Sequence, residues 1–155
     1  MAGLTREAEP VAAKLLKVSE AKLYEQLGIL AKAIAVDPAK AGAFEPLVTY
    51  DEEKMGSKED VREFGRRLFL RWNIEAYKLI CGDELEDMID RSELNKAFGI
   101  SNEAVAAALS SLLISHMGLS PALAVVVASL VIKRFSKPGH GEFCQVWKER
   151  LPRYE

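Results

Sequence analysis

The first part of the chain has the hydrophobic periodicity of a helix. Between residues 9 and 36, apolar side chains recur three, four or seven positions apart, on one helical face: Ala12, Leu16, Leu23, Leu27, Leu30 and Ile34. Pro10 suits the first turn of such a helix, because the N–H that it lacks would be unpaired there. Asp37-Pro38 ends the segment. Ser19 followed by Glu20 can mark a break, so the pattern allows one bent helix or two.

Residues 37–57 form a connection punctuated by Pro38, Gly42, Pro46 and Gly56. Its apolar anchors, which would hold it against the core, are Phe44, Leu47, Val48 and Tyr50. A structureless loop of ~20 residues is uncommon inside a compact domain. We therefore expect a short helical turn within this segment, or a functional role for it.

The clearest helix is predicted over residues 58–81. Ser57 and Asp60 imitate a capping box with the shorter acid, and Gly82 is a natural C-terminal stop. Apolar positions run along its body, and the other side carries a basic stripe made of Arg62, Arg66, Arg67 and Arg71. A solvated helix face explains most such stripes, and a site for a phosphate or an acidic partner is the alternative.

Acidic residues dominate the stretch from 83 to 99, where two short helices are expected and Ser92 can cap the second. Asp83, Asp87 and Asp90 would share one helical face and could attract a divalent cation. Calcium loops, however, need ligands at alternate positions and a glycine at the bend, and that pattern is missing here. An exposed acidic face is the better interpretation.

A charge-free apolar stretch of 29 residues runs from Ala104 to Ile132. Ser101 or Asn102 caps a helix that ends near Met117 at Gly118, and Ser120 then caps a second helix with Pro121 at its first position. The sequence therefore predicts a helical hairpin with arms at about 102–117 and 121–135.

A helix that is apolar all round is buried either at the centre of a protein or in lipid. A spanning helix needs ~20 apolar residues, and neither arm reaches that length, so a buried central hairpin is favoured. Release of the hairpin into a membrane is the alternative, which the basic excess over residues 133–155 would suit. In plan, a bundle around an apolar hairpin resembles pore-forming toxin domains and the apoptosis regulators of mitochondrial membranes, although no motif is shared.

The last helix is predicted over residues 141–151, where Pro152 ends it. Phe143, Val146, Trp147 and Leu151 fall on one side. This helix either packs back over the bundle or docks onto a partner, since an aromatic helix face is a common anchor. The candidate partner-binding residues are Phe143, Trp147, Arg66, Arg67 and Arg71.

Composition changes this picture little. The 155 residues fit one domain, and a net charge of −2 gives no reason to expect nucleic acid as a partner. Cys81 and Cys144 form no metal-ligand pattern, so we expect two reduced, partly buried thiols in a cytoplasmic protein. Residues 1–10 lack the basic-then-apolar order of a signal peptide.

Sequence motifs for catalysis are missing. His116 and His140 are the chain's two histidines, and HExxH, P-loop, GxGxxG and GxSxG motifs do not occur. We expect no enzyme and no catalytic, cofactor-binding or metal-binding residues. The chain is predicted to form one all-α bundle of six or seven helices over residues 1–155. Its expected function is that of a non-enzymatic interaction module for a protein partner or a second copy, with the membrane-active hairpin as the alternative.

Overall fold

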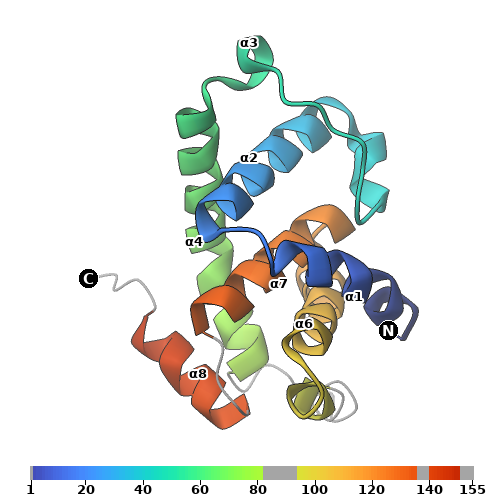
Figure 1. Ribbon diagram of the computed structural model, residues 1–155, viewed down its shortest axis with the longest axis vertical. Coiled ribbons are helices and arrows are strands. Elements are labelled where there is room, and N and C mark those ends of the chain that lie inside the picture. The colour runs from blue at the N-terminus through green and yellow to red at the C-terminus, as the bar shows by residue number, and fades with distance from the viewer. Residues whose placement is uncertain (1, 82–93, 136–139, 151–155) are drawn as a thin grey trace.

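The computed structural model describes residues 2–81, 94–135 and 140–150, and within these ranges it contains helices and no strand. The predicted all-α bundle is confirmed. Helices cross around α7 (Pro121–Phe135), with α3 (Glu52–Met55) at one end of the molecule and α8 (His140–Glu149) at the opposite end (Figure 1).

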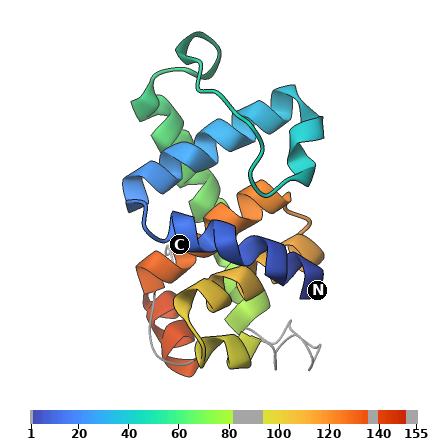
Figure 2. The same ribbon diagram turned by 45° about the vertical axis from the view of Figure 1, so that its right-hand side comes forward.

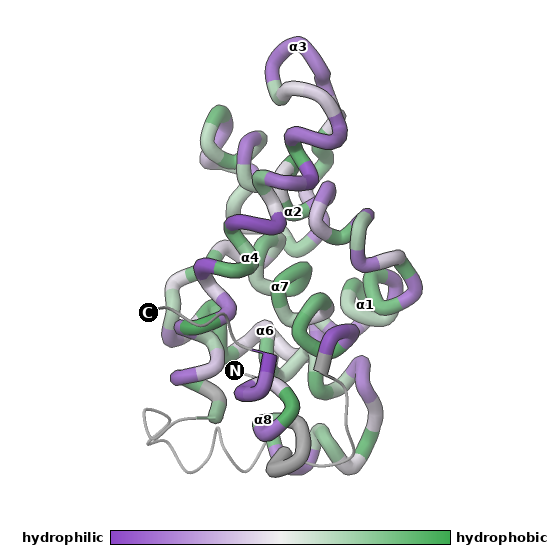
Figure 3. Tube along the Cα trace, turned by 90° about the vertical axis from the view of Figure 1, so that its left-hand side faces the viewer, coloured by the Kyte–Doolittle hydropathy of each residue, from purple (hydrophilic) through white to green (hydrophobic). Residues whose placement is uncertain are grey.

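The centre of the bundle is α7, which confirms the predicted place of the hairpin. Every residue from Ala122 to Ile132 is at most 9% exposed. The other arm is α6 (Asn102–Met117), so both arms have the predicted bounds. Figure 3 shows the tube around α7 mainly hydrophobic and the region of α3 mainly hydrophilic. Among the described residues, no helix is both long and apolar enough to cross a bilayer.

The turn between the two arms forms at Gly118, whose φ of 69° lies in the left-handed region that favours glycine. The start of α6 is capped as predicted, because Ser101 Oγ accepts a hydrogen bond of 3.0 Å from the Ala104 N–H. The predicted Ser120 side-chain cap of α7 is wrong: its Oγ is buried and has no hydrogen-bond partner in the described structure. Backbone bonding alone starts α7, with the Ser120 carbonyl accepting from the Ala124 N–H.

The first periodic segment is two helices, α1 (Ala2–Leu15) and α2 (Glu20–Val36), and Ser19 caps the second of them. Figure 2 shows α1 lying between α2 and α6. Pro10 lies inside α1 rather than in its first turn, so that prediction is wrong. The missing N–H costs one helical hydrogen bond. Contacts on both sides of Pro10 hold the helix together, since Ala8 and Ala12 are fully buried.

The helix predicted over 58–81 is α4 (Lys58–Cys81), and Ser57 Oγ accepts from the Asp60 N–H as expected. It crosses α2 with backbone against backbone. A Cβ placed on Gly65 would lie 1.9 Å from the Tyr24 carbonyl oxygen, and one on Gly28 would lie 2.2 Å from the Val61 carbonyl oxygen. The two glycines therefore make this close approach possible.

The connection between α2 and α4 holds two short helical turns, η1 (Pro38–Gly42) and α3, which confirms the expected turn. Between them, residues 43–50 run without helix; we call this segment the strap. Phe44, Val48 and Tyr50 are half-buried, but Leu47 is 91% exposed and is not the anchor that was predicted. The Tyr50 hydroxyl donates a hydrogen bond of 2.6 Å to the Gly56 carbonyl oxygen.

Part of the acidic stretch lies outside the described residues, including Gly82, Ser92 and the row Asp83, Asp87 and Asp90. Residues 94–98 are helical, in agreement with the second short helix. Across the described ranges, no group of three or more His, Cys, Asp or Glu side chains is arranged to hold a metal ion. The helix predicted at 141–151 is α8, which runs from His140 to Glu149; Leu151 and Pro152 lie outside the described residues.

A disulfide joins Cys81 at the end of α4 to Cys144 in α8, with 5.6 Å between their Cα atoms. The predicted pair of free thiols is therefore wrong. The two cysteines are 63 residues apart in sequence, and only the return of α8 to the end of α4 brings them together.

Candidate functional site

Trp147 does not present its ring to solvent. The side chain is 1% exposed, and its Nε1 donates a hydrogen bond of 2.6 Å to Asn73 Oδ1 on α4. Its ring meets Tyr77 edge to face at 5.6 Å between centroids. The expectation of an exposed Trp147 anchor is wrong, because the indole fills the α4–α8 junction and pairs with a buried amide there. Phe143 belongs to α8, and its side chain is outside the described residues.

The basic stripe on α4 is exposed as predicted, but its first half is largely neutralised. Arg62 donates from Nε to Glu25 Oε1 at 3.2 Å. Arg66 donates two hydrogen bonds, of 2.9 and 2.7 Å, to the Glu63 carboxylate. Arg67 Nε lies 3.4 Å from the same carboxylate. The charges of these three arginines are therefore largely offset by the carboxylates of Glu25 and Glu63.

Glu63, which pairs with two arginines of this stripe, has a strongly lowered pKa. Hydrogen bonding from Arg66 is the largest cause that lowers the pKa of Glu63 from 4.5 to about 2. The charges of Arg66 and Arg67 add to this effect. The same hydrogen bonding raises the pKa of Arg66. The cluster is thus fully ionised near neutral pH, and its single acid is shared by two arginines.

The second half of the stripe forms a shallow groove of about 570 Å³, which we call the α4 groove. Its residues are Arg67, Leu70, Arg71, Ile74, Glu75 and Lys78. Arg71 and Lys78 are exposed, and neither makes a hydrogen bond or an ion pair within the described part of the chain. Leu70 and Ile74 are half-buried between these cations. The groove therefore combines an apolar floor with two cations, Arg71 and Lys78, that form no ion pair in the described structure.

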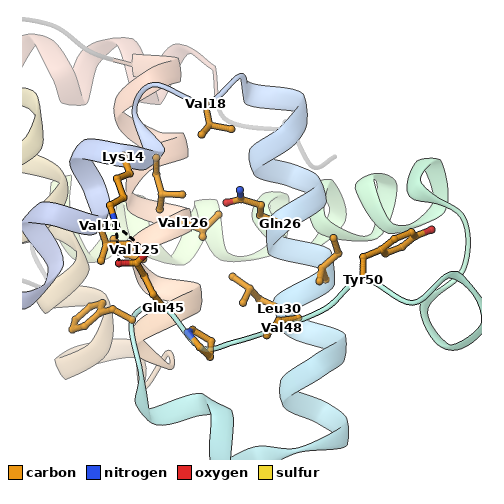
Figure 4. A pocket seen from close by; sticks show the side chains of 14 residues that line it. Val11, Lys14, Val18, Gln26, Leu30, Glu45, Val48, Tyr50, Val125 and Val126 are labelled. Atoms are coloured by element: carbon orange, nitrogen blue, oxygen red, sulfur yellow. Dashed lines mark hydrogen bonds and ion pairs between the residues drawn. The ribbon is translucent and has the colours of Figure 1, made fainter.

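A second hollow, the apolar cleft, has a volume of about 440 Å³ and lies between α1, α2, α7 and the strap (Figure 4). Its lining is mostly aliphatic and aromatic: Val11, Leu15, Val18, Ile29, Leu30, Phe44, Pro46, Val48, Tyr50, Val125 and Val126. The polar members are Lys14, Gln26 and Glu45. The cleft is therefore an apolar hollow with few charged groups.

The charged groups of the cleft form one ion pair at its mouth. Lys14 Nζ on α1 lies 3.4 Å from both carboxylate oxygens of Glu45 on the strap. Their side chains are 70% and 55% exposed, so water screens the pair. Such an arrangement can bind and orient a ligand.

The cleft and Lys78 were missed by sequence reasoning. Two signals pointed to residues 37–57: their apolar side chains predict that the segment lies against the core, and their length predicts a short helical turn or a functional role. Nothing in their spacing, however, places the strap against α1 and α7, which lie far away in sequence. Lys78 was overlooked because it follows the arginines of the stripe by almost two helical turns.

No protein-family profile, curated protein or solved structure matches the chain.

Proposed function

We propose that the protein is a non-enzymatic interaction module that binds an acidic, amphipathic helix of a partner protein in the α4 groove. One observation carries the proposal: Arg71 and Lys78 flank the apolar pair Leu70 and Ile74 without a carboxylate partner in the described structure. An interface matches charge against opposite charge and covers apolar surface with apolar surface. An acidic helix with one apolar stripe offers both.

The geometry of the groove suits a helix as occupant. Leu70 and Ile74 are four positions apart and therefore lie on one ridge of α4, into which the ridges of another helix can pack. From Arg67 to Lys78 the groove extends roughly 16 Å along the helix axis, at about 1.5 Å per residue. Three turns of a partner helix cover that length. Glu75 also lies in the groove, and it would favour a basic residue at one position of the partner.

Self-association through this groove is disfavoured by its charge. A two-fold contact would place Arg71 and Lys78 of one copy opposite the same groove of another copy, and like charges across an interface are unfavourable. We therefore propose a different protein as the partner. Sedimentation velocity should show a monomer at micromolar concentration; a dimer that dissociates when Arg71 is replaced by glutamate would contradict this.

We favour the interaction module over the membrane-active alternative, because release of the hairpin would expose the apolar surface that α7 buries from Ala122 to Ile132. The cytoplasmic location stays a prediction, and the disulfide weighs against it because cytoplasmic thiols are kept reduced. Alkylation of the thiols before cell lysis, followed by mass spectrometry, tests this point.

The experiment uses a synthetic helical peptide with leucines at helical spacing and glutamates along both flanks. We expect the acidic peptide to bind and a version with lysine in place of glutamate not to bind. The double substitution Arg71→Glu/Lys78→Glu should weaken binding at least tenfold at low salt, and the effect should shrink as salt screens it. The matched control is Lys22→Glu/Lys148→Glu, which reverses two exposed lysines on other helices. Equal binding by the two peptides, or an equal effect of both double variants, would overturn the proposal.

A further inference from the structure

The apolar cleft has unequal ends. At one end Lys14 of α1 meets Glu45 of the strap, and at the other the strap leads to the ring of Tyr50 (Figure 4). Between these ends the lining is mostly aliphatic, with Leu30, Val48 and Val126, and Gln26 is its one polar side chain there. The cleft thus carries its charged groups at one end and mainly apolar surface along the rest, and a molecule with a charged head and an apolar chain has the same arrangement.

We propose that the cleft binds one molecule of a long-chain carboxylate, with its carboxylate on Lys14 and its alkyl chain along the strap toward Tyr50. The volume of about 440 Å³ is within the range of small-molecule sites, ~300–1,000 Å³. Burial of the alkyl chain against the aliphatic lining supplies the driving force. This site is separate from the α4 groove and does not depend on the function proposed for that groove.

A negatively charged ligand head group is expected because Lys14 and Glu45 are carried by different kinds of backbone. Lys14 belongs to the last turn of α1, whereas Glu45 lies on the strap, which has no helical hydrogen bonding. The backbone of Lys14 is therefore held by helical hydrogen bonds, and that of Glu45 is not. A ligand carboxylate can take the place of Glu45 on Lys14, and Glu45 then turns into solvent, where its charge is readily hydrated. Because the exposed ion pair contributes little, its loss is a small cost.

Gln26 provides a second polar group inside the cleft. Its side chain is half-buried on α2 and forms no hydrogen bond with the described residues. Figure 4 shows it extending from α2 toward Val126. Its amide is a further hydrogen-bonding group in the lining. The Tyr50 hydroxyl, in contrast, already donates to the Gly56 carbonyl oxygen, so the far end offers the alkyl chain an aromatic ring.

The test compares three ligands with the same alkyl chain: dodecanoate, dodecanol and dodecyltrimethylammonium. Binding to the full chain is measured by calorimetry below the concentration at which each ligand forms micelles. We expect one dodecanoate per chain, bound at least tenfold more tightly than dodecanol, and the cation bound most weakly. Tighter binding of the cation than of dodecanoate would overturn the proposal, as would dodecanoate binding that appears only with micelles.

Variants locate the site. Lys14→Gln should reduce dodecanoate affinity to that of dodecanol, and Glu45→Gln should raise it severalfold because the competing carboxylate is gone. Lys148→Gln, on an exposed lysine of α8, a helix that does not line the cleft, is the matched control and should change nothing. Val48→Trp should block the cleft to all three ligands, with Ile29→Trp as a second filling variant if the first does not fold. Undiminished dodecanoate binding in both Lys14→Gln and a folded filling variant would overturn the proposal. Arg71→Glu/Lys78→Glu should leave dodecanoate binding intact, which separates the two sites.

Discussion

The two junctions of α4 hold it to the rest of the molecule by different means. Where α4 crosses α2, the two backbones are in contact. This contact is possible because Gly28 and Gly65 carry no Cβ atom. At its end, α4 is joined to α8 by the Cys81–Cys144 disulfide and by the hydrogen bond from Trp147 to Asn73. The α2–α4 crossing therefore tolerates no added atom, whereas the bonds of the α4–α8 junction can be removed one at a time.

The largest effect is expected when the covalent bond is removed. The double substitution Cys81→Ser/Cys144→Ser should lower the free energy of unfolding by about 4 kcal/mol, because the open chain regains the entropy of a long loop. Urea denaturation measures this. Reducing agent should lower the stability of the wild type by a similar amount and leave the double variant unchanged. Hydrogen exchange should rise first in α8 and remain slow at the α2–α4 crossing. Equal loss of protection at both junctions would show that they are not independent.

An added methyl group breaks the other junction. Gly65→Ala should lower the free energy of unfolding by about 3 kcal/mol, because its Cβ would overlap the Tyr24 carbonyl oxygen and force the helices apart. Thermal denaturation checks this value. Gly42→Ala is the matched control, since a Cβ there meets nothing within 4 Å. Equal stability of the two alanine variants would show that the backbones of α2 and α4 are not in contact at Gly65.

A substitution at Trp147 measures the contribution of its hydrogen bond to stability separately from that of the disulfide, and a smaller effect is expected. Trp147→Phe keeps an aromatic ring but leaves Asn73 Oδ1 buried and unpaired, which should cost about 2 kcal/mol. Chemical denaturation in the presence of the intact disulfide measures it. Adding Asn73→Leu to this variant removes the unpaired group and should recover part of the loss. Failure of the second substitution to restore any stability would indicate that packing of the indole, rather than its N–H, holds α8.

The smallest effect concerns the solvent side of α4. The pKa of Glu63 is lowered to about 2, so its ionised form is favoured by folding. That contribution is complete above pH 4.5, the ordinary pKa, and is lost as the pH falls through about 2. Carbon NMR of the Glu63 carboxyl group should show this low midpoint, and Arg66→Gln should move it upward. An unchanged midpoint would mean that Arg66 does not hold the carboxylate in solution.

The hairpin shows what could be predicted from the sequence. Its bounds were predictable because Gly118 and Pro121 mark a helix stop and a helix start locally, and its central place followed from the missing polar face. The break at Ser19 and the end of α2 before Pro38 are local signals of the same kind. In all these cases the residues that decide the structure are neighbours in sequence.

The remaining features arise from contacts between distant segments. Trp147 falls on the apolar side of α8, but periodicity does not say whether that side meets a partner or Asn73. The disulfide, the α4–α8 junction and the cleft all depend on how helices pack, and so does the exposure of Leu47. For the α4 groove, the arginines were visible in sequence. Neutralisation by Glu63 and the freedom of Arg71 became clear only from side-chain geometry.

The uniform burial of α7 also limits how this protein can evolve. A surface helix accepts substitutions on its solvent side, so tolerated changes along it recur with the helical repeat. From Ala122 to Ile132 there is no such side, and volume is constrained at every position. A library of single substitutions should therefore show no helical repeat across α7, only preference for small or branched apolar residues. Among related sequences this segment should change slowly and through compensated pairs.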